Sequence, residues 1–171
     1  MKIAANFSGE TIYSNSAEAY SLHEKSRFGE KVDGKIKYSF YEVLFLVEKK
    51  LLDVFFKEKI LNEREITKKM QRLDKKINVK YSVFKDLRTK GYTVKTALKF
   101  GADFRVYEKG KKPGEEHAKW VVFCDFESNR LTWHDFSAKN RVAHSTKKNL
   151  LLAIVDEEGS VTYYEVKWIK P

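Results

Sequence analysis

One change of hydrophobic pattern divides this chain. Between Ser39 and Gly91 apolar residues recur at helical spacing, whereas from Tyr92 onward short β-branched and aromatic runs such as YTVKT, DFRVYE and WVVFCDF are typical of strands. Gly91 can adopt the left-handed conformation that follows a helix. We therefore expect an α/β (α+β) fold: a small mixed N-terminal domain at residues 1–76, and a C-terminal domain at residues 77–171 whose mixed β-sheet is flanked by helices.

Capping signals predict two helices in the N-terminal part. Ser39 and Glu42 can form a capping box, in which each side chain accepts a hydrogen bond from a free backbone N–H. The segment FYEVLFLVEKKLLDVFF is expected to form this helix, with an apolar series of Val43, Leu44, Val47 and Leu51. Asn62 can cap the next helix, whose expected apolar face is Ile66, Met70, Leu73 and Ile77. Weak alternation in residues 2–14, around Ser8 and Gly9, predicts a short hairpin.

The C-terminal part is expected to contain two more helices and a closing hairpin. One helix runs from about Val79 to Lys90, and the other follows a cap at Thr132 and continues to about His144. The runs LLLAIVD and VTYYEVKW are separated by turn residues 157–160. This pattern predicts two antiparallel strands at the end of the chain.

Charge indicates a polyanionic partner. The 171 residues carry 34 Lys and Arg against 24 Asp and Glu, a formal net charge of +10. Such an excess favours nucleic acid over an acidic protein or a neutral metabolite. Charge alone does not distinguish RNA from DNA or a membrane surface.

Cysteine usage and the N-terminus indicate the setting of the protein. Cys124 is the single cysteine, which excludes an internal disulfide and a cysteine-based zinc site and fits a reducing cytoplasm. The segment MKIAANFSGETIYS has no apolar core of a signal peptide, and no apolar run approaches the ~20 residues needed to cross a bilayer. We expect a soluble, unprocessed cytoplasmic protein.

Three residues of the C-terminal part could together cleave RNA without a metal or any other cofactor. Tyr107 lies near the end of an expected strand, His117 just before the next strand, and Lys148 just before LLLAIVD. Cleavage needs a base for the 2′-hydroxyl, an acid for the departing 5′-oxygen and a cation beside the phosphorus. A tyrosine titrates near ~10, so its use as a base requires a neighbouring cation such as Lys148.

Each of the three residues also has a plainer interpretation. Tyr107 could be a half-buried strand residue, and Lys148 a solvated charge beside Lys147. His117 follows two glutamates and could be a surface residue or a metal ligand, although no second histidine lies at short spacing from it. The remaining histidines are His23, His134 and His144, which we expect to be surface or capping residues.

Residues 77–171 resemble the archaeal tRNA-splicing endonuclease family. The resemblance is carried by YSVFKDLRTKGYTVKTALKFGADFRVYEKG, HAKWVV and RVAHSTKKNLLLAIVDEEGSVTYYEVKWIKP, and the N-terminal half is similar only loosely. In that family a tyrosine, a histidine ten positions later and a lysine thirty-one further on form the catalytic triad. The resemblance implies that Tyr107 is the general base, His117 the general acid and Lys148 the charge stabiliser. It also implies a metal-independent cut at a bulge-helix-bulge junction of precursor tRNA, with 2′,3′-cyclic phosphate and 5′-hydroxyl ends.

The resemblance assigns two further roles. Arg141 and Trp168 match a pair that clamps a flipped bulge base, although by pattern alone they are a helix-face charge and a strand aromatic. Asp156, Glu157 and Glu158 match an acidic loop that enters a basic groove of a neighbouring subunit, although in isolation they form a solvated turn. The implied assembly is a homotetramer or a dimer of heterodimers with a structural subunit, and the sequence leaves this choice open.

Two other functions remain to be weighed. A non-catalytic RNA-binding or structural subunit of the same complex could keep the fold, the positive charge and the acidic loop, but should lack the triad. A metal-dependent nuclease would need clustered carboxylates on adjacent strands, and none stands near the triad in the sequence. We therefore expect a tRNA-splicing endonuclease.

Overall fold

The computed structural model describes residues 2–171, and the chain divides after Asn78 into two compact units. Each unit has one mixed β-sheet, and five α-helices are present within the described residues. The expected α/β class with a mixed sheet in both parts is confirmed. None of the helices in residues 2–171 has both the length and the apolar character needed to span a bilayer.

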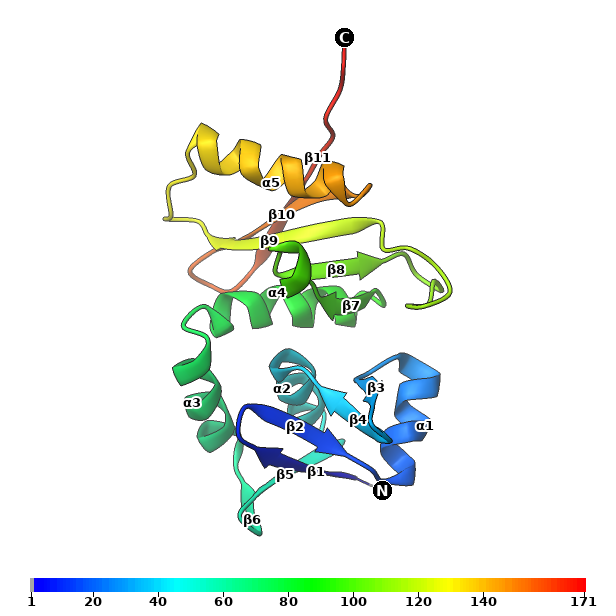
Figure 1. Ribbon diagram of the computed structural model, residues 1–171. Coiled ribbons are helices and arrows are strands. Elements are labelled where there is room, and N and C mark those ends of the chain that lie inside the picture. Colours follow the sequence, from blue (N-terminus) through cyan, green and yellow to red (C-terminus); the bar gives the residue numbers. More distant parts are fainter. Residues whose placement is uncertain (1) are drawn as a thin grey trace. The chain divides into compact units, whose positions relative to one another are not determined.

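The N-terminal unit is built on a six-stranded sheet (Figure 1). Its strands are β1 (Ile3–Ser8), β2 (Thr11–Ser14), β3 (Glu30–Val32), β4 (Lys35–Tyr38), β5 (Leu52–Phe56) and β6 (Lys59–Leu61). They lie in the order β3-β4-β2-β1-β5-β6, and β1 and β5 form the parallel pair. The predicted hairpin around residues 8–9 is present as β1 and β2.

Three helices of this unit are α1 (Ala17–Ser26), α2 (Phe40–Glu48) and α3 (Glu63–Leu73). The predicted capping box of α2 is confirmed, because the side chains of Ser39 and Glu42 each accept the expected backbone bond. Asn62 and Glu65 form a second box at the start of α3. In both helices the cap residue and the glutamate three positions later accept hydrogen bonds from backbone N–H groups that would otherwise lack a partner.

The expected helix FYEVLFLVEKKLLDVFF is wrong over its second half. Helix α2 ends at Glu48, and Lys50 has a positive φ of 58°, which turns the chain. Leu51 therefore lies outside the helix and is 42% exposed. The rest of the segment, LDVFF, forms strand β5, which pairs with strand β1 near the start of the chain. A strand partner some fifty residues away in sequence outweighed the local helical pattern.

The expected single apolar face of α3 is also wrong in part. Ile66 and Met70 are fully buried, but Leu73 is 43% exposed at the last residue of the helix. Asp74 then has extended backbone angles, φ −138° and ψ 106°, which break the helix. Ile77 is buried as the first residue of the next helix, α4 (Ile77–Thr89).

The buried carboxylate of Glu42 joins α2 to the turn before β3. Glu42 is 3% exposed, and its Oε1 accepts from the Gly29 N–H at 2.9 Å while Oε2 accepts from the Ser39 N–H at 2.9 Å. A buried charge is tolerated only when it is hydrogen-bonded in this way. Gly29 itself has φ +72°, and a Cβ there would lie 2.3 Å from Cγ2 of Ile36.

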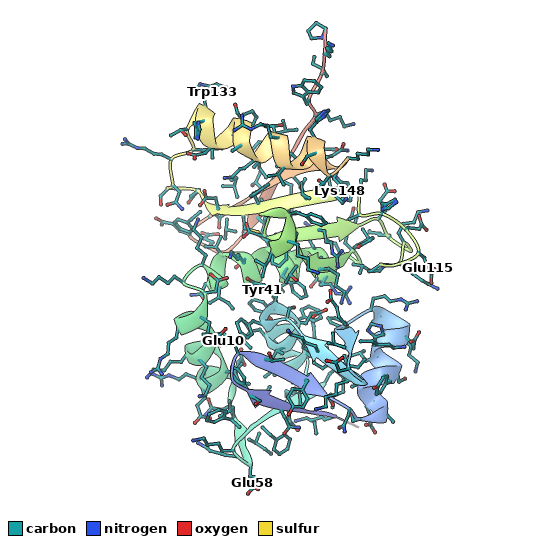
Figure 2. The ribbon with its side chains drawn as sticks, in the orientation of Figure 1. Glu10, Tyr41, Glu58, Glu115, Trp133 and Lys148 are labelled. Atoms are coloured by element: carbon teal, nitrogen blue, oxygen red, sulfur yellow. The ribbon has the colours of Figure 1, made fainter. Side chains whose placement is uncertain are left out.

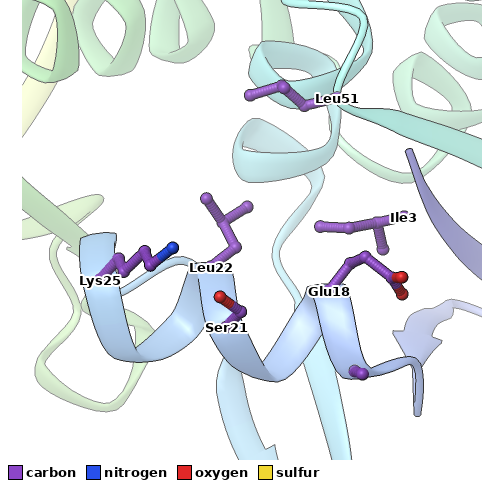
Figure 3. Close-up of a pocket in the computed structure, with 7 residues that line it drawn as sticks. Ile3, Glu18, Ser21, Leu22, Lys25 and Leu51 are labelled. Carbon is purple, nitrogen blue, oxygen red and sulfur yellow. The ribbon is translucent and has the colours of Figure 1, made fainter. Parts of the chain in front are cut away.

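A shallow apolar hollow of about 390 Å³ lies beside α1 (Figure 3). Ile3, Leu22 and Leu51 line it, with Glu18 and Lys25 at its polar side. The hollow contains none of the residues for which the sequence predicts a functional role.

The C-terminal unit is built on a five-stranded sheet. Its strands are β7 (Thr93–Thr96), β8 (Phe104–Tyr107), β9 (Trp120–Phe126), β10 (Asn149–Val155) and β11 (Val161–Val166), in the order β11-β10-β9-β8-β7. The 3₁₀ turn η1 (Leu98–Phe100) and helix α5 (Trp133–Ser145) complete it together with α4. The predicted closing hairpin is present as β10 and β11.

Helices α4 and α5 cover opposite faces of this sheet (Figure 1). On the α5 face, Ala143 packs with Val121 and Leu150. On the α4 face, the rings of Phe84 and Phe104 lie 5.9 Å apart. Strand residues alternate between the two faces, so a sheet covered on both sides is apolar in consecutive positions, as WVVFCDF and LLLAIVD are.

We expect Gly29→Ala to destabilise the protein by ~1–3 kcal/mol more than Gly34→Ala. Both glycines have a positive φ, so both substitutions carry the same backbone cost. Only at Gly29 does the added methyl meet a buried side chain, Ile36, whereas nothing lies within 4 Å at Gly34. Urea denaturation of the two variants measures the difference, and equal losses would contradict this packing.

Candidate active site

The strand directions bring Tyr107, His117 and Lys148 to one edge of the C-terminal sheet. Strand β8 is antiparallel to β9, and β9 is parallel to β10, with Val106, Trp120 and Asn149 in register. The C-terminal end of β8 and the N-terminal ends of β9 and β10 therefore coincide. Tyr107 is the last residue of β8, Lys148 immediately precedes β10, and His117 stands three residues before β9. Figure 2 shows Lys148 and Glu115, from the loop that carries His117, toward the same end of the sheet.

Tyr107 is more buried than its position at a strand end predicts. It is 4% exposed, whereas the sequence suggested a ring projecting toward a loop. Tyr107 does not project beyond the sheet, because it still pairs with Thr93 of β7 and its strand lies between β7 and β9. The ring is thus less accessible at this end of the sheet than the sequence suggested.

The loop that carries His117 is shaped by ion pairs. Glu108 and Lys119 join its two ends at 2.6 Å, and this lysine lowers the pKa of the Glu108 carboxyl. Within the loop, Lys111 and Glu116 pair at 2.6 Å. The His117 side chain is exposed and makes no hydrogen bond to any of the described residues. An imidazole presented in this way can donate a proton to a ligand at the sheet edge.

Lys148 is fixed by the C-terminal cap of α5. Lys147 has a positive φ of 54°, and its N–H bonds to the His144 carbonyl at 3.0 Å. The Lys148 N–H bonds to the Ala143 carbonyl at 2.9 Å. These two bonds form a Schellman motif, which ends the helix and leads the chain directly into β10.

The Lys148 ammonium is partly shielded from water and lies near a second positive charge. Its Nζ donates to the Thr146 carbonyl at 2.9 Å and lies 5.5 Å from the centroid of the Phe100 ring. Desolvation, followed by the nearby Arg105 charge, lowers the pKa of Lys148 below its usual value. Arg105 is on β8 two residues before Tyr107, so both side chains face the same side of the sheet. Two cations held close together attract a phosphate group.

Arg141 and Trp168 line a common groove of about 730 Å³ between α5 and the C-terminal tail. Trp168 was expected in a strand, but β11 ends at Val166, and Trp168 lies in the tail with 62% of its surface exposed. An adjoining hollow of about 320 Å³ is lined by Trp168, His144 and Lys148. The groove of Arg141 therefore continues to the cation at the sheet edge.

The acidic turn has two kinds of carboxylate. Oδ1 of Asp156 accepts from the N–H groups of Glu158 and Ser160 at 2.9 and 2.8 Å, so this residue shapes the turn. The side chains of Glu157 and Glu158 are exposed. Glu157 and Glu158 are thus the carboxylates of the turn that are left exposed to a partner.

Sequence patterns missed two residues of this region. His144 is exposed, as expected of a surface residue, but sequence patterns did not predict that its ring would lie 4.6 Å from the Trp168 ring, centroid to centroid. Its spacing of three from Arg141 places these two residues along one side of α5, which was a usable signal, whereas Lys148 lies beyond the end of the helix. Arg105 had no such signal, because only sheet pairing brings it to Lys148. Within residues 2–171, no group of three or more His, Cys, Asp or Glu could hold a metal ion.

We expect Lys148 to titrate at a lower pH than an ordinary lysine. Replacing Arg105 by Gln should move this titration to higher pH, because a neighbouring positive charge disfavours protonation. Arg105→Lys, which keeps the charge, is the matched control. NMR of the lysine ε-carbons, with Lys148→Arg to assign the signal, follows the titration. An unchanged pKa of Lys148 in Arg105→Gln would contradict the coupling between these two charges.

The chain is similar to one family over both units. The model of the tRNA intron endonuclease N-terminal domain matches residues 3–67, and that of the catalytic C-terminal domain matches residues 77–163. A tRNA-splicing endonuclease of Thermococcus kodakarensis is 43% identical over 95% of this chain and 96% of its own length. One of Pyrococcus furiosus is 40% identical over 99% of both chains. One of Nanoarchaeum equitans is 43% identical over 76% of this chain and 87% of its own length.

Proposed function

The chain belongs to the tRNA intron endonuclease family and is an endoribonuclease, and we propose that it cuts precursor tRNA at bulge-helix-bulge junctions without a metal. The observation that carries the site is the common sheet edge of Tyr107, His117 and Lys148. The strand directions bring these residues, ten and thirty-one positions apart in sequence, to the same end of the sheet. A non-catalytic subunit would have no need of this combination.

The proposed reaction is an attack by the RNA on itself. Tyr107 takes the proton of the 2′-hydroxyl, and the 2′-oxygen bonds to the adjacent phosphorus. The bond from phosphorus to the 5′-oxygen breaks, and His117 gives its proton to that leaving oxygen. The products are a 2′,3′-cyclic phosphate and a 5′-hydroxyl, and no water or metal takes part.

Lys148 stabilises the negative charge that accumulates on the phosphate oxygens. Its partly desolvated position strengthens this interaction, because charges attract more strongly where water is excluded. Its charge, and that of Arg105 beside it, also favours the phenolate form of a tyrosine at the same sheet edge. The proposed use of Tyr107 as a base depends on these neighbouring cations.

The groove of Arg141 and Trp168 suits an unpaired base. A guanidinium and an indole can both stack on a base whatever its identity, at ~1–3 kcal/mol per base. The groove adjoins the hollow lined by Lys148, so a base held there would belong to a nucleotide close to the scissile phosphate. We propose that bulge geometry is recognised mainly through this clamp.

We also propose self-association through the acidic turn, as a homotetramer or with a structural subunit. The exposed glutamates of this turn can enter a basic groove on another chain. The chain's net charge of +10 provides basic surface for such a contact when the partner is a second copy.

We expect His117→Ala to lower the cleavage rate by ~10²–10⁴-fold while leaving RNA affinity nearly unchanged. The substitution removes the proton donor but leaves Lys148 and Arg105, the cations that are expected to contact the phosphate. Single-turnover cleavage and filter binding of a bulge-helix-bulge RNA measure the two quantities, with His134→Ala on exposed helix surface as the control. Equal losses of binding and cutting would reject the role of His117.

Cleavage should persist in excess EDTA, and activity restored only by Mg²⁺ would contradict the metal-free reaction.

We expect the double variant Glu157→Lys and Glu158→Lys to have a lower mass than the wild type in light scattering. Asp156 is left in place because its carboxylate holds the turn. The matched control reverses two exposed turn carboxylates of the N-terminal unit, Glu10 and Glu58, and should keep the wild-type mass. An unchanged mass in the first variant would end the assembly role of this turn.

A further inference from the structure

Helix α5 begins with an aromatic pair that the proposed site does not use. Trp133 is 82% exposed, and its ring meets the Phe136 ring edge-on, at 5.6 Å between centroids and 86° between planes. Figure 2 shows Trp133 at the outer end of the helix. A large ring left in water next to a second ring is a candidate contact surface.

Helical geometry places this pair on the side of α5 that borders the groove of Arg141 and Trp168. Phe136 is itself one of the residues that line the groove. Asn140 and His144, which also line it, stand seven and eleven residues after Trp133, close to two and three full turns. Trp133 therefore extends the groove by about one turn toward the start of the helix.

Charge favours RNA as the occupant of this extended surface. The residues that line the groove and the adjoining hollow include Arg141, Lys147, Lys148 and Lys167, and neither lining contains an Asp or Glu. Beside Trp133, the Asp135 carboxylate accepts from Thr132 as part of the helix cap. Aromatic faces beside cations are the combination by which proteins bind single-stranded nucleic acid.

We propose that Trp133 and Phe136 form a second stacking site, which binds an unpaired nucleotide of the RNA substrate beyond the one held by Arg141 and Trp168. The inference rests on the proposed function and adds a subsite to it. Trp133 lies eight residues, or ~12 Å along the helix axis, from Arg141. This separation is several times the rise of ~3.4 Å between stacked bases, so the two sites hold different nucleotides of one strand.

Binding of RNA to a cleavage-deficient His117→Ala background tests the proposal. Adding Trp133→Ala should weaken the affinity for bulged RNA at least fivefold, the equivalent of the ~1 kcal/mol lower bound for one stacked base. Trp133→Phe should retain most of the affinity, because it keeps an aromatic face. The matched control is Leu98→Ala, which removes an apolar side chain that is 76% exposed on η1, outside the groove. A duplex without unpaired nucleotides should bind all variants equally.

Tryptophan fluorescence gives a direct readout of stacking. RNA binding should quench the emission of the wild type more than that of Trp133→Phe, which keeps Trp120 and Trp168. Affinity for bulged RNA that is unchanged in Trp133→Ala would overturn the proposal. So would a lower oligomer mass with unchanged RNA affinity, because the pair would then contact a second copy of the chain. If the wild type binds bulged RNA but does not cut it, the proposed function is wrong. The affinities of the Trp133 variants for bulged RNA still test the stacking site in that case.

Discussion

The candidate site depends on the backbone ladder of β9, which pairs antiparallel with β8 on one side and parallel with β10 on the other. Because these hydrogen bonds are made by the backbone, they fix the strand registers largely independently of the side chains at the sheet edge. The loop before β9 and the cap before β10 then set the positions of His117 and Lys148. A site made of distant residues thus obtains its geometry from the most regular part of the fold.

Much of the fold could be predicted because its signals are local. The capping boxes at Ser39 and Asn62 are each completed within four residues, and the strands of the C-terminal sheet have apolar runs bounded by turns. The errors arose where a distant segment decided the structure. LDVFF became a strand because β1 lay available as a partner, and a run of this composition fits a buried helix equally well. The break at Asp74 likewise has no proline or glycine to announce it.

The residues of the candidate site were proposed from the sequence, but their environment could not be predicted from it. The positions of Tyr107, His117 and Lys148 came from spacing and family resemblance, and their roles remain proposals. Their surroundings follow from tertiary structure: Tyr107 is buried although it ends its strand, and sheet pairing brings the charge of Arg105 close enough to Lys148 to lower its pKa. The contact between the His144 and Trp168 rings depends on where the tail leaves β11, which no pattern in the tail indicates.

The crossover from β9 through α5 to β10 sets an order in which the site can be completed during synthesis. The parallel strands β9 and β10 cannot pair until the connecting helix α5 has been synthesised and has packed on the sheet. Ordering this long connection must precede the pairing. The growing chain therefore possesses its tyrosine and histidine well before it gains the lysine at the end of the crossover. An unfinished polypeptide still attached to the ribosome therefore lacks the cation that the proposed reaction requires.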